Sequence, residues 1–230
     1  MQTALESTAI AKLRARLRGE VIRPGDASYE RARRVWNGRI NRYPALIVYC
    51  ADPDDVRTAI DFACSVGLPI TVRGGGHSMV GFSVSNGALV IDLSHLKGIQ
   101  IDPRTGIARV QAGLTLGEFV QATQVYGLAT TTGTVAGTGI GGLTLGGGIG
   151  WLMGKYGLTI DSLLAVELVT ADGQRLSANA TQHPDLFWGL RGGGGNFGIA
   201  TAFTFQLHPV ETVLAGRCCR SSSRYRTPCA

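Results

Sequence analysis

The segment Arg73-Gly74-Gly75-Gly76-His77-Ser78 has residue types and a spacing that suit an anionic cofactor. Three consecutive glycines let successive backbone N–H groups turn to one side with no Cβ in the way, and such a concave nest accepts phosphate oxygens. Arg73 adds positive charge beside the nest. A glycine-rich turn needs no imidazole for its own geometry, so we interpret His77 as a residue with a role toward the cofactor.

A second glycine-rich segment, Gly137-Thr138-Gly139-Ile140-Gly141-Gly142, matches the G-x-G-x-x-G pattern of Rossmann dinucleotide sites. That pattern needs a strand directly before it and a long helix directly after it. Residues 130–134 are polar, and the glycines at 146–148 and 150 interrupt any long helix. We therefore interpret the segment as a second cradle for the phosphates and rings of a cofactor, paired with the first.

A third glycine cluster, Arg191-Gly192-Gly193-Gly194-Gly195-Asn196-Phe197-Gly198, leads into a predicted strand. Asn196 and Phe197 can either pack against a flat ligand or fill the turn, and the sequence leaves both readings open. Ser78 directly follows His77, so the two cannot form the relay of a serine hydrolase, and no G-x-S-x-G motif is present. No two histidines share helical spacing with a carboxylate, which argues against a metal site.

The apolar pattern places the first cluster at the end of a βαβ unit. Residues 44–50 are typical of a strand, and Asp52-Pro53 then supplies an N-cap and a proline at the first position of a helix that ends at Gly67. Residues 69–72 form the second strand and lead directly into Arg73. Further strands are predicted at 88–93, 107–112, 163–170 and 199–207, with helices at 115–126 and 185–190.

These elements predict an α+β fold with two lobes, a small βαβ lobe and a larger, mostly antiparallel sheet flanked by helices. We expect residues 1–42 to form an amphipathic helix at 4–18 and an extended arm across the surface. Residues 43–212 form the cofactor-binding domain. Residues 213–230 have no apolar period and are predicted to be a basic, disordered tail.

The formal net charge of +6 comes from the two ends of the chain. Residues 1–42 hold ten basic and four acidic residues and 213–230 hold four arginines and no acid, whereas 43–212 hold eight basic and twelve acidic residues. The acidic balance of the central region argues against a nucleic-acid partner. Residues 119–154 carry no charge, but ten glycines between 133 and 154 favour buried loops over a membrane helix.

The five cysteines are odd in number and lack C-x₂-C spacing, which argues against a disulfide framework. The first residues, Met1-Gln2-Thr3-Ala4-Leu5-Glu6, lack the basic and apolar regions of a secretory signal. We therefore expect a cytoplasmic protein.

From Tyr43 to about Val210 the sequence resembles the FAD-binding PCMH-type domain of the vanillyl-alcohol oxidase and para-cresol methylhydroxylase superfamily, and within it the berberine bridge enzyme-like oxidases. The resemblance rests on four ordered stretches: Arg73–Ser78, residues 139–150, Lys155-Tyr156-Gly157-Leu158 with Asp161, and 191–198. It implies that His77 bonds covalently to the 8α-methyl carbon of FAD, which would fix the flavin and raise its reduction potential. Some members add a cysteine link near the place of Val135, but no cysteine lies between Cys64 and Cys218, so a single covalent bond is expected.

The resemblance further implies oxidation of a small alcohol, sugar or amine, with O₂ as the electron acceptor. Family members are longer, and their second domain carries most catalytic residues, so the catalytic residues stay unassigned here. The tail resembles nothing in the family, which suggests a frameshift or an early stop. The alternative to an FAD-dependent oxidoreductase domain is a truncated flavin-binding module without turnover. The residues expected to bind the cofactor are Arg73, Gly74, Gly75, Gly76, His77, Ser78, Thr132, Gly133, Gly137, Thr138, Gly139, Gly142, Leu143 and Ile199.

Overall fold

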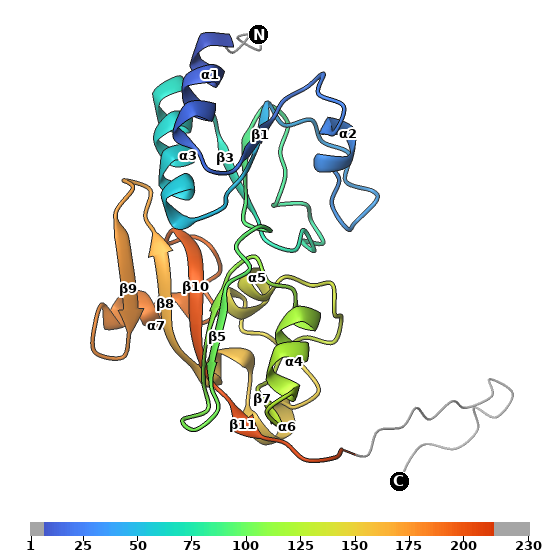
Figure 1. The fold of residues 1–230 in the computed structure, drawn as a ribbon, viewed down its shortest axis with the longest axis vertical. Coiled ribbons are helices and arrows are strands. Elements are labelled where there is room, and N and C mark those ends of the chain that lie inside the picture. Colours follow the sequence, from blue (N-terminus) through green and yellow to red (C-terminus); the bar gives the residue numbers. More distant parts are fainter. Residues whose placement is uncertain (1–6, 214–230) are drawn as a thin grey trace, which may run out of the picture.

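The computed structural model describes residues 7–213, which form a small lobe and a larger lobe (Figure 1). The first residues of the predicted helix at 4–18 and the predicted tail from residue 214 onward lie outside the described residues. The small lobe is built on a four-stranded mixed sheet and the larger lobe on a five-stranded antiparallel sheet with helices. The predicted α+β class and its two-lobed architecture are confirmed.

The small sheet has the strand order β1-β2-β4-β3. Strands β2 and β3 both run parallel to β4, which lies between them, and β1 is antiparallel to β2. The strand predicted at 88–93 thus joins the βαβ unit instead of the larger sheet. The carboxyl ends of the three parallel strands lie at the same end of the sheet, and the loop after β3, residues 74–78, leaves from that end. The strands are β1 Glu20–Ile22, β2 Leu46–Tyr49, β3 Ile70–Arg73 and β4 Leu89–Asp92.

Helix α3, Pro53–Val66, connects β2 to β3 and begins and ends where the sequence predicts. The side chain of Asp52 accepts hydrogen bonds from the N–H groups of Asp54 and Asp55, at 2.8 and 3.0 Å. Gly67 ends the helix in the left-handed conformation, with φ of 67°. The apolar face of α3 packs into the hydrophobic core that runs through both lobes.

The predicted surface arm is wrong for residues 20–22, which form β1 at the edge of the small sheet. The segment after β1 includes helix α2, Tyr29–Ala32, and covers one face of that sheet: Tyr29 and Ala32 pack with Ile47 and Val90 in a second hydrophobic cluster. The opposite face of the sheet contributes to the main core. Charged residues dominate the segment's sequence, so its few buried apolar side chains give no visible period.

The larger sheet has the strand order β5-β6-β10-β8-β9, with all neighbours antiparallel. The predicted strands at 107–112, 163–170 and 199–207 form its centre, whereas the edge strands β5 and β9 were not predicted. Both edge strands are half-exposed and carry polar residues, so they lack the apolar runs of the central strands. The strands are β5 Ile99–Asp102, β6 Ile107–Gln111, β8 Leu163–Val169, β9 Arg175–Asn179 and β10 Ile199–Gln206; β7 Leu128–Ala129 pairs separately with β11 His208–Pro209.

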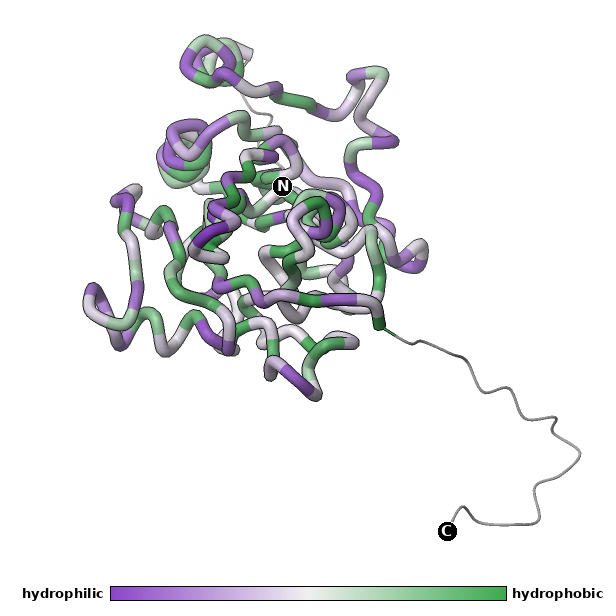
Figure 2. Tube along the Cα trace, turned by 60° about the horizontal axis from the view of Figure 1, so that its bottom comes forward, coloured by the Kyte–Doolittle hydropathy of each residue, from purple (hydrophilic) through white to green (hydrophobic). Residues whose placement is uncertain are grey.

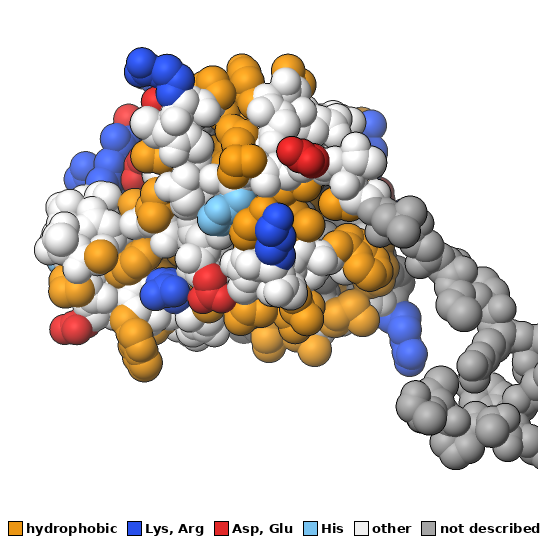
Figure 3. Space-filling model, turned by 90° about the horizontal axis from the view of Figure 1, so that it is seen from below, with side chains coloured by type: hydrophobic (Ala, Val, Ile, Leu, Met, Phe, Trp, Pro, Cys, Tyr) orange, Lys and Arg blue, Asp and Glu red, His pale blue; other side chains and the backbone are white. Residues whose placement is uncertain are grey.

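Short helices lie against the larger sheet (Figure 1), and hydrophobic and hydrophilic residues are interspersed along the chain (Figure 2). The predicted capping box is present: the Thr115 hydroxyl accepts the Glu118 N–H, and the Glu118 carboxylate accepts the Thr115 N–H at 2.7 Å. The lower face shows hydrophobic side chains among few charged ones (Figure 3). The remaining helices are α1 Ser7–Arg16, α4 Leu116–Gln124, α5 Ile140–Leu145, α6 Met153–Tyr156, η1 Thr159–Ser162 and α7 Pro184–Leu190.

The uncharged stretch 119–154 is divided between several short elements and glycine-rich loops. Across residues 7–213, no helix is both long enough and apolar enough to cross a membrane. The buried Phe119, Ile140 and Leu145 of this region belong to the main core, so its apolar character is used inside the protein.

The carboxylate of Asp55 ties the N-terminal segment to the rest of the small lobe. It is buried and accepts the backbone N–H groups of Arg18, Gly19 and Ala51, each at 2.9 Å. Asp55→Ala leaves these donors without their acceptor, and we expect it to lower the free energy of unfolding by about 2–4 kcal/mol in urea denaturation. Asp54→Ala is the control, because Asp54 is exposed and makes only a surface ion pair with Arg175. Equal losses in the two variants would contradict the role of Asp55.

Candidate functional site

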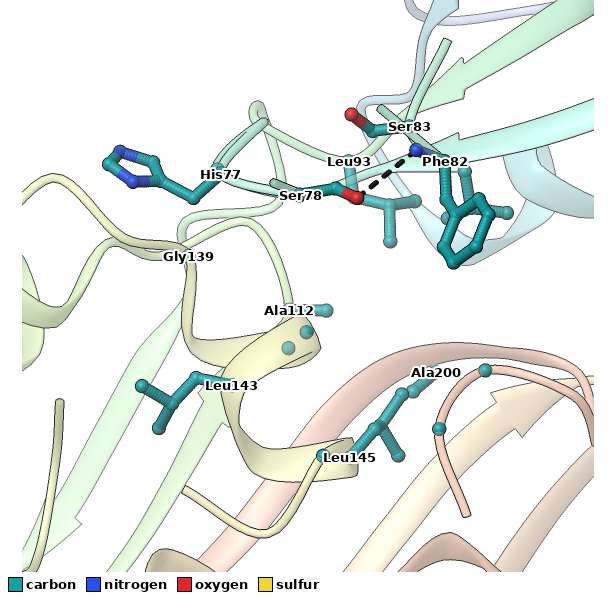
Figure 4. Close-up of a pocket in the computed structure, with 18 of the residues that line it drawn as sticks. His77, Ser78, Phe82, Ser83, Leu93, Ala112, Gly139, Leu143, Leu145 and Ala200 are labelled. Atoms are coloured by element: carbon teal, nitrogen blue, oxygen red, sulfur yellow. Dashed lines mark hydrogen bonds between the residues drawn. The ribbon is translucent and has the colours of Figure 1, made fainter. Parts of the chain in front are cut away.

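A cavity of about 510 Å³ lies between the loop after β3 in the small lobe and α5 in the larger lobe (Figure 4). Its walls are the loop after β3, the segment around Thr138 and Gly139, helix α5, the glycine-rich loop before β10, and the first residues of β10. Glycines and apolar side chains make up most of the lining. His77 lies at one end in Figure 4 and Phe82 with Ser83 at the other, while Leu143 and Leu145 face them from α5.

The backbone of the loop after β3 presents donors without acceptors. Within residues 7–213, the N–H groups of Gly74, Gly75, Gly76, His77 and Ser78 donate no hydrogen bond. Gly76 has φ of 69°, a left-handed conformation that glycine adopts without strain. Since backbone donors in folded proteins are nearly always paired, this run of N–H groups without a protein acceptor beside a cavity suits an anion.

The first two glycine clusters meet backbone to backbone at Gly75 and Gly139. A Cβ on Gly75 would lie 2.2 Å from the Gly139 nitrogen, and one on Gly139 would lie 2.3 Å from the Gly75 nitrogen. The second loop is in turn held by Ile140, whose N–H donates to the carbonyl of Leu114 at 2.9 Å. Each glycine is therefore required by the other, and the contact sets the spacing of the lobes at the cavity.

Arg73 and Asp92 form a buried ion pair at the carboxyl ends of β3 and β4, where they are register partners. Arg73 Nε donates to Asp92 Oδ2, and Asp92 Oδ1 accepts the Ser94 N–H at 2.8 Å. The Arg73 side chain does not line the cavity and its charge is neutralised beneath the loop. Burial, and then the charge of Asp92, raise the pKa of neighbouring Tyr49, so this phenol stays neutral.

The imidazole of His77 is held between both lobes. Its Nδ1 lies 3.4 Å from Thr138 Oγ1, with donor and acceptor roles that depend on the tautomer. A Cβ on Gly137 would lie 3.4 Å from His77 Nε2, so the second loop passes close to the ring. On its other side the ring stacks on Trp36. His77 thus reaches the cavity with a defined orientation.

The third glycine cluster closes the cavity beside α5. The N–H of Gly194 donates to the carbonyl of Leu145, 3.0 Å away. Phe197 fills the turn, because a Cβ on Gly189 would lie 2.8 Å and one on Gly193 would lie 2.9 Å from its ring. Asn196 Nδ2 donates to the Gly193 carbonyl at 2.9 Å. Of the two readings left open, the structure supports packing within the turn, since neither side chain lines the cavity.

Most of the predicted cofactor residues come together at the cavity. Four of them do not line it: Arg73, Thr132, Gly133 and Gly137. The last three lie behind the wall. A Cβ on Gly133 would lie 2.5 Å from Leu143, the Thr132 carbonyl packs on Gly150, and Gly137 packs on His77. Their direct contact with a cofactor stays a prediction. The predicted residues that do line the cavity are Gly74, Gly75, Gly76, His77, Ser78, Thr138, Gly139, Gly142, Leu143 and Ile199.

Several lining residues were not predicted. Leu93 and Ala112 are the last residues of two predicted strands, so the rule that ligands bind at strand ends could have found them. Phe82 and Ser83 lie in a loop without any motif. Ser83 is buried, and its Oγ has no hydrogen-bond partner within the described residues, which makes it a free polar group at the cavity wall.

The α+β fold, the nest and the glycine-walled cavity define a domain for an anionic cofactor. Residues 44–179 match the family model described as the FAD binding domain, more than half of the chain. The chain belongs to this family, and its relatives include FAD-linked oxidoreductases and a berberine bridge enzyme-like protein, which confirms the resemblance. Within residues 7–213 no cluster of three or more His, Cys, Asp or Glu residues could hold a metal ion.

Relatives align over nearly the whole chain. (R)-6-Hydroxynicotine oxidase of Paenarthrobacter nicotinovorans is 39% identical over 87% of this chain and 44% of its own length. The solved structure of Physcomitrella patens BBE-like 1 is 33% identical, with a TM-score of 0.83 over 86% of this chain and 44% of that chain. Glucooligosaccharide oxidase of Acremonium strictum, described with a 6-S-cysteinyl, 8α-N1-histidyl FAD, is 31% identical, with a TM-score of 0.79 over 86% and 42%. The chain spans less than half the length of these relatives.

The Gly75–Gly139 contact predicts a sharp response to a single methyl group. Gly139→Ala forces backbone atoms apart, and we expect a loss of about 3 kcal/mol in the free energy of unfolding together with weaker FAD binding. Gly154→Ala is the matched control, because a Cβ there meets nothing within 4 Å. Urea denaturation and FAD titration of both variants give the comparison. A Gly139→Ala variant as stable as Gly154→Ala would refute the contact.

Removing the charge of Arg73 distinguishes a role in the ion pair with Asp92 from a role in binding the cofactor. Arg73→Met leaves Asp92 buried and unpaired, and we expect a stability loss of about 3–5 kcal/mol. Arg73→Met/Asp92→Asn should recover part of that loss, because Asn still accepts the Ser94 N–H. If Arg73 instead contacts the cofactor, the single variant will keep its stability and lose FAD affinity in a salt-dependent way. Urea denaturation and FAD titration at two salt concentrations distinguish the two.

Proposed function

We propose that the cavity holds FAD, with its pyrophosphate on the nest formed by residues 74–78. The observation that carries the proposal is the run of five unpartnered backbone N–H groups beside the cavity. Backbone donors suit phosphate because they add no side-chain bulk and are fixed before binding. Neutralisation of Arg73 by Asp92 leaves these N–H groups as the main donors to the anion.

Other features of the cavity fit FAD. Gly142 and Gly195 line it, and a Cβ on either would meet no atom within 4 Å, so side chains there would occupy open space at the wall. The unpartnered Ser83 Oγ offers a hydrogen bond to the cofactor's polar edge. Apolar Leu93, Leu143 and Ile199 suit a flat ring system.

We further infer that His77 bonds to the 8α-methyl carbon of the flavin. A bond forms between an imidazole nitrogen and that carbon, the imidazole N–H and one methyl C–H are lost, and O₂ takes up the two hydrogens as H₂O₂. His77 is the sole imidazole lining the cavity among the described residues, and Thr138 and Trp36 already restrict its ring. The histidyl flavin named for the Acremonium oxidase supports the same link here. No cysteine lies between Cys64 and Cys218, so a second link is not proposed.

When bound, FAD supplies a two-electron acceptor, and we propose a small alcohol, sugar or amine as the electron donor and O₂ as the final acceptor. The residues described here bind and orient the cofactor. No Asp, Glu, Lys or Tyr lines the described cavity, so apart from His77 it offers no evident general base. This observation favours a second candidate, a flavin-binding module without turnover.

Acid precipitation of the protein after incubation with FAD tests the link. We expect yellow colour to stay with the wild-type pellet and to leave with the supernatant in His77→Ala, because only the covalent bond survives denaturation. His183→Asn is the control: His183 is exposed, has φ of 50°, and lies outside the cavity lining, and asparagine tolerates that backbone conformation. Colour in the supernatant of the wild-type protein would disprove the histidyl link, and absence of flavin altogether would disprove the site.

Oxygen consumption with panels of alcohols, sugars and amines then separates the two candidate functions. An oxidase consumes O₂ and releases H₂O₂ with at least one class of substrate. A flavin-loaded chain that consumes none with any class supports the binding module. Photoreduction of the bound flavin followed by its reoxidation in air checks that the flavin can react with O₂ in either case.

A further inference from the structure

A residue outside the glycine clusters holds the face of the His77 imidazole. The rings of Trp36 and His77 are stacked, with centroids 5.1 Å apart and 20° between their planes. The backbone N–H of Trp36 also donates to the carbonyl of Gly76, 3.1 Å away. Trp36 therefore engages both the ring of His77 and the loop that carries it, although its own side chain is 58% exposed.

The segment around Trp36 is itself fixed to the small lobe. Arg33 is buried, and its guanidinium donates to Glu30 at 2.7 and 3.0 Å and to Asn41 Oδ1 at 2.6 Å. On the other side of Trp36, Asn37 Nδ2 donates to the carbonyl of Met79 at 2.8 Å. Because both flanks are anchored, holding the indole against His77 costs little additional conformational entropy.

The edge of the imidazole meets a different part of the protein. Thr138 Oγ1 lies 3.4 Å from Nδ1, on the loop of the larger lobe. The indole limits tilting of the ring, and the threonine limits its rotation. An unrestrained imidazole turns freely enough about its side-chain bonds to lose alignment with a reacting carbon, and alignment at near contact decides the rate of such a reaction.

We propose that Trp36 is a positioning residue for covalent attachment of the flavin, holding the His77 ring so that one nitrogen faces the 8α carbon. The inference rests on the proposed histidyl link. Trp36 takes part in none of the bond changes given above, so its removal affects the rate of attachment more than the binding of FAD.

The test uses the full apo chain mixed with FAD, with attachment measured as acid-stable flavin over time. We expect Trp36→Ala to slow attachment about threefold to tenfold, the size of effect that one aromatic stack carries. Trp36→Phe should restore most of the rate. Trp188→Ala is the matched control, because Trp188 is 81% exposed on α7 and does not line the cavity. Noncovalent FAD affinity, measured in His77→Ala with and without Trp36→Ala, should change less than about twofold.

A second readout needs no flavin. The stacked indole shifts the NMR signals of the His77 ring protons upfield, and these signals should move downfield in Trp36→Ala and stay unchanged in Trp188→Ala.

If wild type and Trp36→Ala attach flavin at the same rate, the role of Trp36 is overturned while the histidyl link stands. Equal losses of attachment and noncovalent affinity also overturn it, because Trp36 would then only support the binding loop. A wild-type chain that binds FAD but never attaches it overturns the proposed link, and with it this role.

Discussion

The close approach of Gly75 and Gly139 is the constraint on which the site depends. The two residues come from loops of different lobes, and each would place a Cβ within 2.3 Å of the other's backbone nitrogen. No side chain can be inserted, so the backbones themselves set the distance between the lobes. Once that distance is set, the loop after β3 faces α5 across the cavity, and the nest opens toward apolar walls.

A cavity of this kind needs walls without side chains and a frame that holds its shape without them. Glycine weakens local structure, because it has more backbone freedom to lose on folding. Several contacts offset that loss close to the loops. Arg73 and Asp92 join the ends of β3 and β4, the Gly194 N–H donates to Leu145, and Phe197 fills the turn between Gly189 and Gly193. The flexible residues thus lie between rigid ones.

The sequence predicts the central elements because each carries a local signal of its own. Asp52, Pro53 and Gly67 define α3 by capping chemistry alone, and the apolar runs of β2 and β10 reflect burial on both faces. Strands β5 and β9 lack such a signal, since an edge strand is half-exposed and its pairing depends on a partner that is distant in the sequence. Strand β1 fails for the same reason, because Val21 and Ile22 lie within a run of charged residues.

The candidate site likewise has a part that the sequence predicts and a part that it does not. Glycine clusters are readable because the backbone conformations and close contacts they permit exclude other residues. Which atoms then face the cavity follows from tertiary packing: Arg73 stands beside the nest in sequence, yet its guanidinium points to Asp92, and Ser83 reaches the wall from a loop with no motif. A charged residue next to a binding loop binds the ligand only if no closer partner takes its charge.

The N-terminal segment shows why a binding loop is not a self-contained unit. Residues 33–42 do not line the cavity, yet their backbone and side chains contact residues 76–84 at several positions. The carbonyl of Arg34 accepts a hydrogen bond from the Arg73 guanidinium at 3.4 Å. The Arg42 guanidinium donates to the carbonyls of Gly81 and Val84, each at 2.8 Å. These carbonyls belong to the loop that carries Phe82 and Ser83. The N-terminal segment therefore contacts the small-lobe wall of the cavity both beside His77 and beside Phe82. The geometry offered to the cofactor is therefore set by residues that precede the matched FAD-binding region as well as by those within it.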